Sequence, residues 1–213
     1  MREVFQQELR EVQGRLVEIA ELVETAIEQA TAAFGASDVA LAEQVIDEAD
    51  HADRLAVELD ELTIDILARQ QPVASDLRLM VGALRMSSSL ERMADLAQHI
   101  AQLARYRYPE SAIPQGLRKT FARMGEIDVQ MAAQLVQLLR SQDPRLIDEI
   151  RDLDDALDEL HAKVFEKVLS DKVRADTTGV VDATLASRYH ERFGDHAVNI
   201  TKQMNFFLSG ALQ

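Results

Sequence analysis

The residues best suited to do chemistry in this sequence are carboxylates spaced four positions apart. Glu91 and Asp95 stand in a Glu-Arg-x-x-Asp segment, and Glu191 and Asp195 repeat that segment in the second half of the chain. A four-residue spacing places both side chains on one face of a helix. Oxygen ligands in a chain without cysteine favour hard cations such as Mg, Mn, Ca or Fe over a structural zinc site. The repeated segment therefore predicts metal binding, and the identity of the ion (Mg, Mn, Fe or Zn) stays open.

Further carboxylates lie on the neighbouring helical segments. Asp154 and Asp158 are four apart, each one residue beyond an apolar stripe, and Asp53 takes the corresponding place in the first half. If these segments pack against those with the repeated motif, each half gathers several carboxylates in one shallow groove. Raised pKa values, arginine partners or bound cations would each relieve the repulsion between them. The alternative is that Arg92 and Arg192 form ordinary surface ion pairs with these acids.

A second metal motif is weaker. Glu48 and His51 form a Glu-x-x-His, the element from which di-iron carboxylate bundles build their sites. The second half offers only Asp158 and His161 at that spacing. A di-iron site needs two such elements facing the core of a four-helix bundle, so the match is partial.

Two further groups of polar residues, three arginines and three histidines, are expected at or near the protein surface. Three arginines recur every seven residues and line one helix face, which either docks an acidic partner or is simply solvated: Arg78, Arg85 and Arg92. Three histidines near the acidic faces are interpreted as surface residues or neighbours of the acids rather than ligands: His99, His190 and His196.

The elements that must position these residues are helices. Among 213 residues there are only 8 glycines and 4 prolines, and aromatic residues make up 5%. The absence of cysteine excludes disulfides and thiol nucleophiles.

A net charge of −14 argues against binding to nucleic acid or an anionic membrane. No apolar run approaches a membrane span, and no phosphate-binding loop or Ser/His/Asp arrangement is visible. We therefore expect a cytoplasmic protein that is not an enzyme.

Apolar periodicity and the prolines predict six helices, at about residues 3–33, 38–68, 75–106, 116–140, 144–170 and 177–209. A polar break at residues 106–116 divides the chain into two units, residues 1–107 and 108–213. Residues 76–100 and 176–200 share nine identities in 25 positions. We predict an all-α fold of six helices in two tandem, pseudo-symmetric three-helix bundles. Phe206, Phe207 and Leu208 are either core or a self-association patch, which leaves a homodimer open.

Four segments carry a family resemblance, at residues 42–46, 70–78, 90–95 and 191–200. The run Gln-Pro-Val-Ala-Ser-Asp-Leu-Arg precedes the first Glu-Arg-x-x-Asp, and the second stands near the C-terminus. Over about residues 3–209 the chain resembles the PhoU family of phosphate-transport accessory and regulatory proteins. The resemblance implies two pseudo-symmetric three-helix bundles, with metal clusters held on the surface by Glu/Asp-x-x-x-Asp motifs.

The family's metal motifs map onto positions of this sequence. One motif departs from the pattern, because Ala49 stands where an acid is expected before Asp53, with Asp50 as the nearest substitute. We therefore expect the first repeat to bind metal more weakly, or with fewer ions, than the second. The complete motifs are Glu91/Asp95, Asp154/Asp158 and Glu191/Asp195.

The resemblance also implies a regulatory role. Family members keep the phosphate-starvation response off when phosphate is plentiful, by contacting the phosphate-sensing histidine kinase and the ATPase subunit of the phosphate ABC transporter. Two other interpretations stay open: a di-iron oxidase or ferroxidase that uses Glu48, His51 and the Glu/Asp pairs, and a plain helical scaffold with solvated acids.

Overall fold

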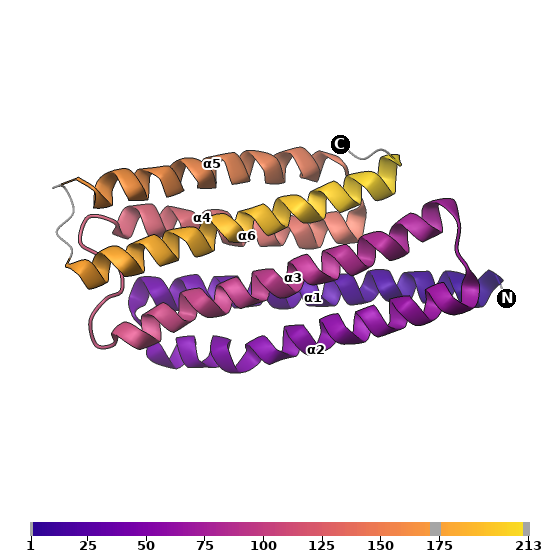
Figure 1. Cartoon of the computed structure of the whole chain (residues 1–213), viewed down its shortest axis with the longest axis horizontal. Coiled ribbons are helices and arrows are strands. Elements are labelled where there is room, and N and C mark those ends of the chain that lie inside the picture. The colour runs from indigo at the N-terminus through magenta and orange to yellow at the C-terminus, as the bar shows by residue number, and fades with distance from the viewer. Residues whose placement is uncertain (1, 171–175, 211–213) are drawn as a thin grey trace.

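The chain forms six long helices, and the computed structural model describes residues 2–170 and 176–210. All six run roughly along the long axis of the molecule (Figure 1). The predicted helices are confirmed, with differences of a few residues at their ends. The helices are α1 (Arg2–Ala36), α2 (Val39–Gln70), α3 (Ala74–Arg107), α4 (Arg118–Ser141), α5 (Arg145–Val168) and α6 (Thr177–Ser209).

The turn between α1 and α2 shows how the local sequence sets the helix ends. Asp38 caps α2, because its side chain accepts a hydrogen bond of 3.1 Å from the Leu41 N–H. The left-handed residue of this turn is Ser37, with φ of 57°. The Asp38 N–H donates to the carbonyl oxygen of Ala33, so the reversal comes after Gly35, which stays helical.

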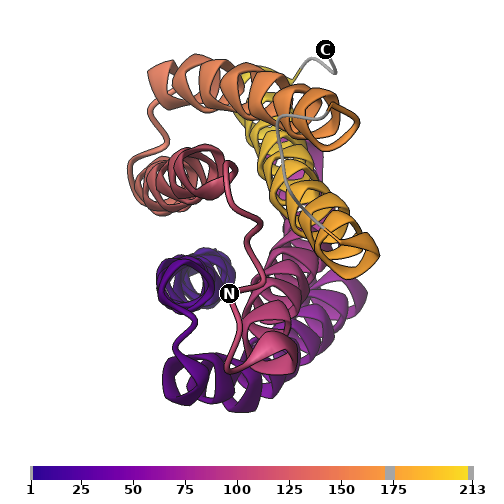
Figure 2. The same ribbon diagram turned by 90° about the vertical axis from the view of Figure 1, so that its left-hand side faces the viewer.

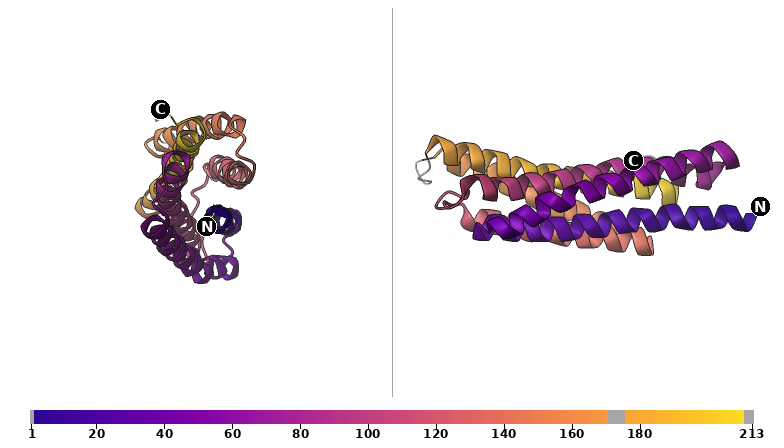
Figure 3. Two further views of the ribbon diagram at one scale, coloured as in Figure 1. Left: turned by 90° about the vertical axis from the view of Figure 1, so that its right-hand side faces the viewer. Right: turned by 90° about the horizontal axis from the view of Figure 1, so that it is seen from below.

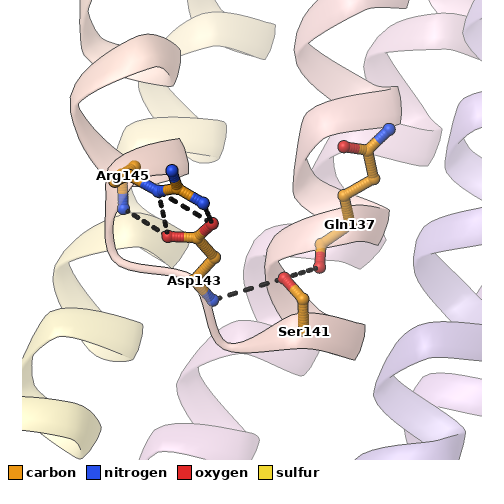
Figure 4. Close-up of polar contacts among 4 residues, drawn as sticks. All are labelled: Gln137, Ser141, Asp143 and Arg145. Atoms are coloured by element: carbon orange, nitrogen blue, oxygen red, sulfur yellow. Dashed lines mark hydrogen bonds and ion pairs between the residues drawn. The ribbon is translucent and has the colours of Figure 1, made fainter.

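The turn between α4 and α5 is closed by side chains (Figure 4). The Ser141 hydroxyl donates to the Gln137 carbonyl oxygen over 2.7 Å and accepts from the Asp143 N–H over 3.3 Å. The Asp143 carboxylate accepts from the Arg145 N–H and from its guanidinium. These bonds to Arg145 hold the pKa of Asp143 below its usual value. The short connection makes α4 and α5 antiparallel neighbours.

The helices pack within each half and between the halves. Helices α1, α2 and α3 contact one another, and so do α4, α5 and α6. The halves meet where α1 packs against α4 and α3 against α6. Seen end-on, α1 and α4 lie inside the curve that α2, α3, α6 and α5 form (Figure 2, and from the other end in Figure 3). The predicted apolar stripe of α5 faces the core, where Ile150, Leu157 and Val164 are buried.

Two contacts between the halves depend on particular residues. A Cβ at Gly125 of α4 would lie 3.0 Å from the Cβ of Thr31 in α1, so glycine permits the close approach of these helices. At the junction of α3 and α6, the Arg107 guanidinium bonds both carboxylate oxygens of the buried Asp182. Within the described residues, no helix has both the length and the apolar character to cross a membrane.

Candidate metal-binding surfaces

Four carboxylates predicted from the sequence come together where α5 packs against α6. We call Asp154, Asp158, Glu191 and Asp195 the α5–α6 acidic surface. Burial, together with the negative charges of its neighbours, chiefly Asp158 and Asp195, raises the pKa of Asp154 to about 7. The two helices therefore present their acids to one shared, partly dehydrated space.

A glycine in α6 permits this convergence. A Cβ at Gly194 would lie 2.5 Å from Oδ1 of Asp154 and 2.9 Å from Cδ2 of Leu157. Any larger residue at position 194 would push α5 away or turn the Asp154 side chain out. Gly194, which directly precedes Asp195 of the second motif, thus lets the Asp154 carboxylate lie against the backbone of α6.

One cation offsets part of the negative charge on this surface. The Arg188 guanidinium pairs with Glu191, whose side chain is 14% exposed. The pKa of Glu191 is still raised, by burial and by the charge of Asp195, against the lowering effect of Arg188. The alternative interpretation of the sequence gave the pairing role to Arg192, which makes no ion pair within the described residues. Arg188 instead lies one helical turn before Glu191 and reaches its carboxylate.

A smaller cluster lies where α2 packs against α3. We call Asp53, Glu91 and Asp95 the α2–α3 acidic surface. Burial and the charge of Asp53 raise the pKa of Glu91, and burial and the charge of Asp95 raise that of Asp53. Arg92 donates to Oδ2 of Asp95 over 2.8 Å, as the ion-pair interpretation expected. Asp50 is exposed and adds to the charge around Asp53.

One further acid of this region, Asp60, was not among the candidate residues predicted from the sequence. It is half-buried, burial raises its pKa, and its charge raises the pKa of Glu91. Its position seven residues after Asp53, two helical turns along the same face of α2, was the available signal.

The Glu-x-x-His elements do not assemble a shared site in the described residues. Glu48 and His51 are exposed and line a pocket of about 310 Å³ between α1 and α2, together with Ala49. In the other half Asp158 is exposed, and Nδ1 of His161 lies 2.7 Å from the Ser187 hydroxyl. Since α2 and α5 do not contact each other in the described residues, the inward-facing arrangement of the di-iron interpretation is not formed there.

Two of the three arginines in the predicted stripe, Arg85 and Arg92, are exposed, and Arg78 and Arg85 also contact residues of α6. The guanidinium of Arg78 lies 6.0 Å from the centre of the Phe206 ring, and Arg85 donates to Gln203 over 3.4 Å. Arg92 is exposed and turns to Asp95. A role of these arginines in partner binding stays a prediction.

The three histidines differ from one another. His190 is buried, with its side chain 1% exposed, and Nδ1 lies 2.5 Å from Oδ2 of the fully buried Asp128. The interpretation of His190 as a surface residue is therefore wrong, because α6 turns this position into the core. His99 is half-buried against Tyr189, with ring centres 5.1 Å apart. His196 is half-buried, and burial and Arg192 lower its pKa.

The donor chemistry of the two acidic surfaces fits a hard cation. A bound cation stabilises carboxylates that lie close enough together to have raised pKa values, because it offsets the repulsion between their negative charges. Within residues 2–170 and 176–210, no three or more acids and histidines are arranged to hold a metal ion together. Chelation would thus require side-chain rotation at the surface, which exposed Asp158 and Asp195 permit.

Comparisons with known proteins agree with this architecture. The family model of the PhoU domain matches residues 16–104 and again residues 121–204. These two matches, one in each half, confirm the tandem repeat of three-helix units. The predicted boundary between residues 107 and 108 stays a prediction.

Relatives span the full chain. The phosphate-specific transport system accessory protein PhoU homolog 2 of Mycobacterium tuberculosis (strain ATCC 25618 / H37Rv) is 37% identical over 211 residues, covering 99% of each chain. PhoU homolog 1 of Mycobacterium leprae is 36% identical, covering 99% of this chain and 95% of that protein. The crystal structure of PhoU from Pseudomonas aeruginosa superposes with a TM-score of 0.89 at 28% identity, covering 97% of this chain and all of that one.

Proposed function

Since this chain belongs to the PhoU family, we propose that it is an accessory protein of a phosphate-specific transport system that regulates phosphate uptake. We further propose that it represses the phosphate-starvation response when phosphate is ample. The observation that carries the proposal is the match to curated accessory proteins over 99% of both chains. Such coverage includes both helical repeats and both acidic surfaces.

The proposed partners are the phosphate-sensing histidine kinase and the ATPase subunit of the phosphate ABC transporter. Binding transmits a signal only if the protein prefers one state of its partner over the other. The exposed arginines Arg85 and Arg92 on α3 offer positive charge to an acidic partner patch. A cytoplasmic location follows from this proposal, because an ATPase subunit works where ATP is available.

We propose that the protein acts by binding and not by catalysis. The groups that converge in the described structure are carboxylates with one arginine at each surface, and they offer no activated nucleophile. The polar pair of Ser187 and His161 does not change this, because Ser187 is buried.

Metal ions are proposed as regulatory or structural ligands. The α5–α6 acidic surface would hold them through its four carboxylates, and the α2–α3 acidic surface through three. A bound divalent or ferric ion would supply positive charge that offsets the repulsion within each surface. The residues of the chain would keep the carboxylates together: Gly194 by admitting Asp154, and Arg188 and Arg92 by balancing part of the charge.

The test of the regulatory role is a phosphate-starvation reporter in the native host. With the gene deleted, the reporter should switch on in ample phosphate, and the intact protein should silence it again. A reporter that stays on after the intact protein is restored would contradict the proposal. A host with a second homologue requires the double deletion as the starting strain.

The arginine prediction has a separate test with purified components. R85E and R92E should weaken binding to the ATPase subunit or to the cytoplasmic part of the kinase, measured by calorimetry. R10E is the matched control, because Arg10 is an exposed arginine on α1. Equal loss of affinity in all three variants would indicate a general charge effect and contradict a role of α3.

A further inference from the structure

A pocket of about 640 Å³ opens beside the contact between α1 and α4, and no residue of either acidic surface lines it. Its apolar lining includes Phe34 from α1, Phe121 and Val129 from α4, and Ile113 from the preceding loop. Phe34 and Phe121 pack edge to face, with ring centres 5.5 Å apart. We call this the α1–α4 pocket. Its volume lies within the range of pockets that hold small molecules.

Small residues at the rim keep the pocket open. Ala32 and Gly35 on α1 and Ala122 on α4 are exposed and line it. A Cβ at Gly35 would meet no atom within 4 Å, so the space above it is empty. Larger side chains at these positions would fill the opening. Open apolar space alone does not indicate a ligand, but α6 contributes a residue with an unmet hydrogen-bonding group.

His190 lines this pocket and carries a buried polar atom that has no partner among the described residues. Its ring lies against both aromatic residues of the lining, with centres 6.4 Å from Phe34 and 6.0 Å from Phe121. Nδ1 is engaged by Asp128, whereas Nε2 is buried and has no hydrogen-bond partner among the described residues. Buried polar atoms are nearly always hydrogen-bonded, because an unmet one costs free energy. The pocket therefore lacks one hydrogen-bonding group that its contents would supply.

We propose that the α1–α4 pocket binds a small, largely apolar molecule that carries one hydroxyl group, which hydrogen-bonds to Nε2 of His190. A hydroxyl both donates and accepts, so it suits either protonation state of Nε2. The apolar body of the ligand lies against Phe34 and Phe121. None of the four carboxylates of the α5–α6 acidic surface lines this pocket. Glu191 is the next residue after His190, but consecutive residues of a helix point about 100° apart, so the two side chains leave α6 in different directions.

The test compares two probes that differ in one group. 2-Naphthol and 2-methylnaphthalene have nearly the same shape, but only the first carries a hydroxyl. They are titrated into the isotope-labelled full chain, and backbone amide and histidine ring resonances are followed by NMR. 2-Naphthol should shift the amides of Gly35 and Gly125 and the ring nitrogens of His190. 2-Methylnaphthalene should bind about tenfold more weakly, because it lacks one hydrogen bond.

A filled pocket supplies the control. A122L places a larger side chain at an exposed position of the lining and should weaken 2-naphthol binding at least tenfold. A68L makes the same change at an exposed alanine of α2 outside the pocket and should bind as the wild type does. Circular dichroism checks that both variants are folded. The proposal is overturned by equal affinity for the two probes, by unchanged binding to A122L, or by binding that leaves His190 unshifted.

Discussion

The raised pKa of Asp154 predicts that the metal-free protein loses stability as the pH rises. In the folded state this carboxyl keeps its proton until about pH 7, whereas its ordinary pKa is 3.8. Between these values the folded chain binds a proton that the unfolded chain has released, so unfolding becomes easier with increasing pH. Below pH 4 both states are protonated and the penalty is absent. Above pH 7 the penalty is complete. The substitution D154N removes the ionisable group and keeps its shape.

The magnitude follows from the size of the shift. A change from 3.8 to about 7 corresponds to about 4 kcal/mol at 1.36 kcal/mol per unit. Asp154 is only half-buried, so water screens its charge, and we reduce the expected effect to about 2 kcal/mol. At pH 8 without metal, D154N should therefore be more stable than the wild type by about 2 kcal/mol. At pH 4 the two should differ little.

Urea unfolding followed by circular dichroism, with EDTA present at both pH values, measures this difference. D152N is the matched control, because Asp152 is an exposed acid on the same helix and its loss removes the same formal charge. If D152N stabilises the protein at pH 8 as much as D154N does, the effect is one of net charge. The predicted effect of Asp154 is refuted if the free energies of unfolding of D154N and the wild type depend on pH in the same way.

Three other predictions concern metal, packing and the junction between the halves. Calorimetry with Mn²⁺ should find tighter binding at the α5–α6 acidic surface than at the α2–α3 acidic surface, and D195N should remove the tighter site; equal affinities would contradict this order. G194A should destabilise the protein by about 1–3 kcal/mol, because the added Cβ has no room beside Asp154. The control G14A lies at an open helical position and should stabilise the protein by up to about 1 kcal/mol. Thermal unfolding measures both changes. R107M leaves the buried Asp182 without its cation and should lower the midpoint of urea unfolding; an unchanged midpoint would show that this pair does not hold the halves together.

The helices were predictable because their apolar stripes and turn residues are local features of the sequence. Leu157 and Val164 repeat at helical spacing and are buried, as expected. Asp38 caps α2 as a short polar residue before an apolar run should. The left-handed residue of the preceding turn is Ser37 and not the nearby Gly35, because a glycine near a helix end does not by itself show which residue reverses the chain.

The acidic surfaces were predictable in part. The four-residue spacing places Glu191 and Asp195 on one face, and the repeat indicated that this face matters. The sequence did not reveal that Gly194 admits Asp154, since that contact depends on how closely α5 approaches α6. The ion-pair interpretation likewise named Arg192 instead of Arg188, because the direction of a long side chain depends on its neighbours in space.

The pair of Asp128 and His190 was missed for a similar reason. Asp128 falls on the apolar stripe of α4, four residues after Met124 and three before Met131, and a polar residue on a buried stripe was the available signal. Its partner stands 62 residues away on α6. Only the packing of α4 against α6 brings the two side chains together.

The most direct test of the proposed regulatory role of the α5–α6 acidic surface uses the reporter strain that lacks this gene, or both homologues where a second exists. This strain is complemented with the wild-type protein or with variants of the acidic surface. The wild type and the D152N control should silence the phosphate-starvation reporter in ample phosphate. The triple variant D154N/E191Q/D195N, folded and present at the same level, should leave the reporter on. A triple variant that silences the reporter as fully as the wild type would contradict the claim that regulation works through the α5–α6 acidic surface.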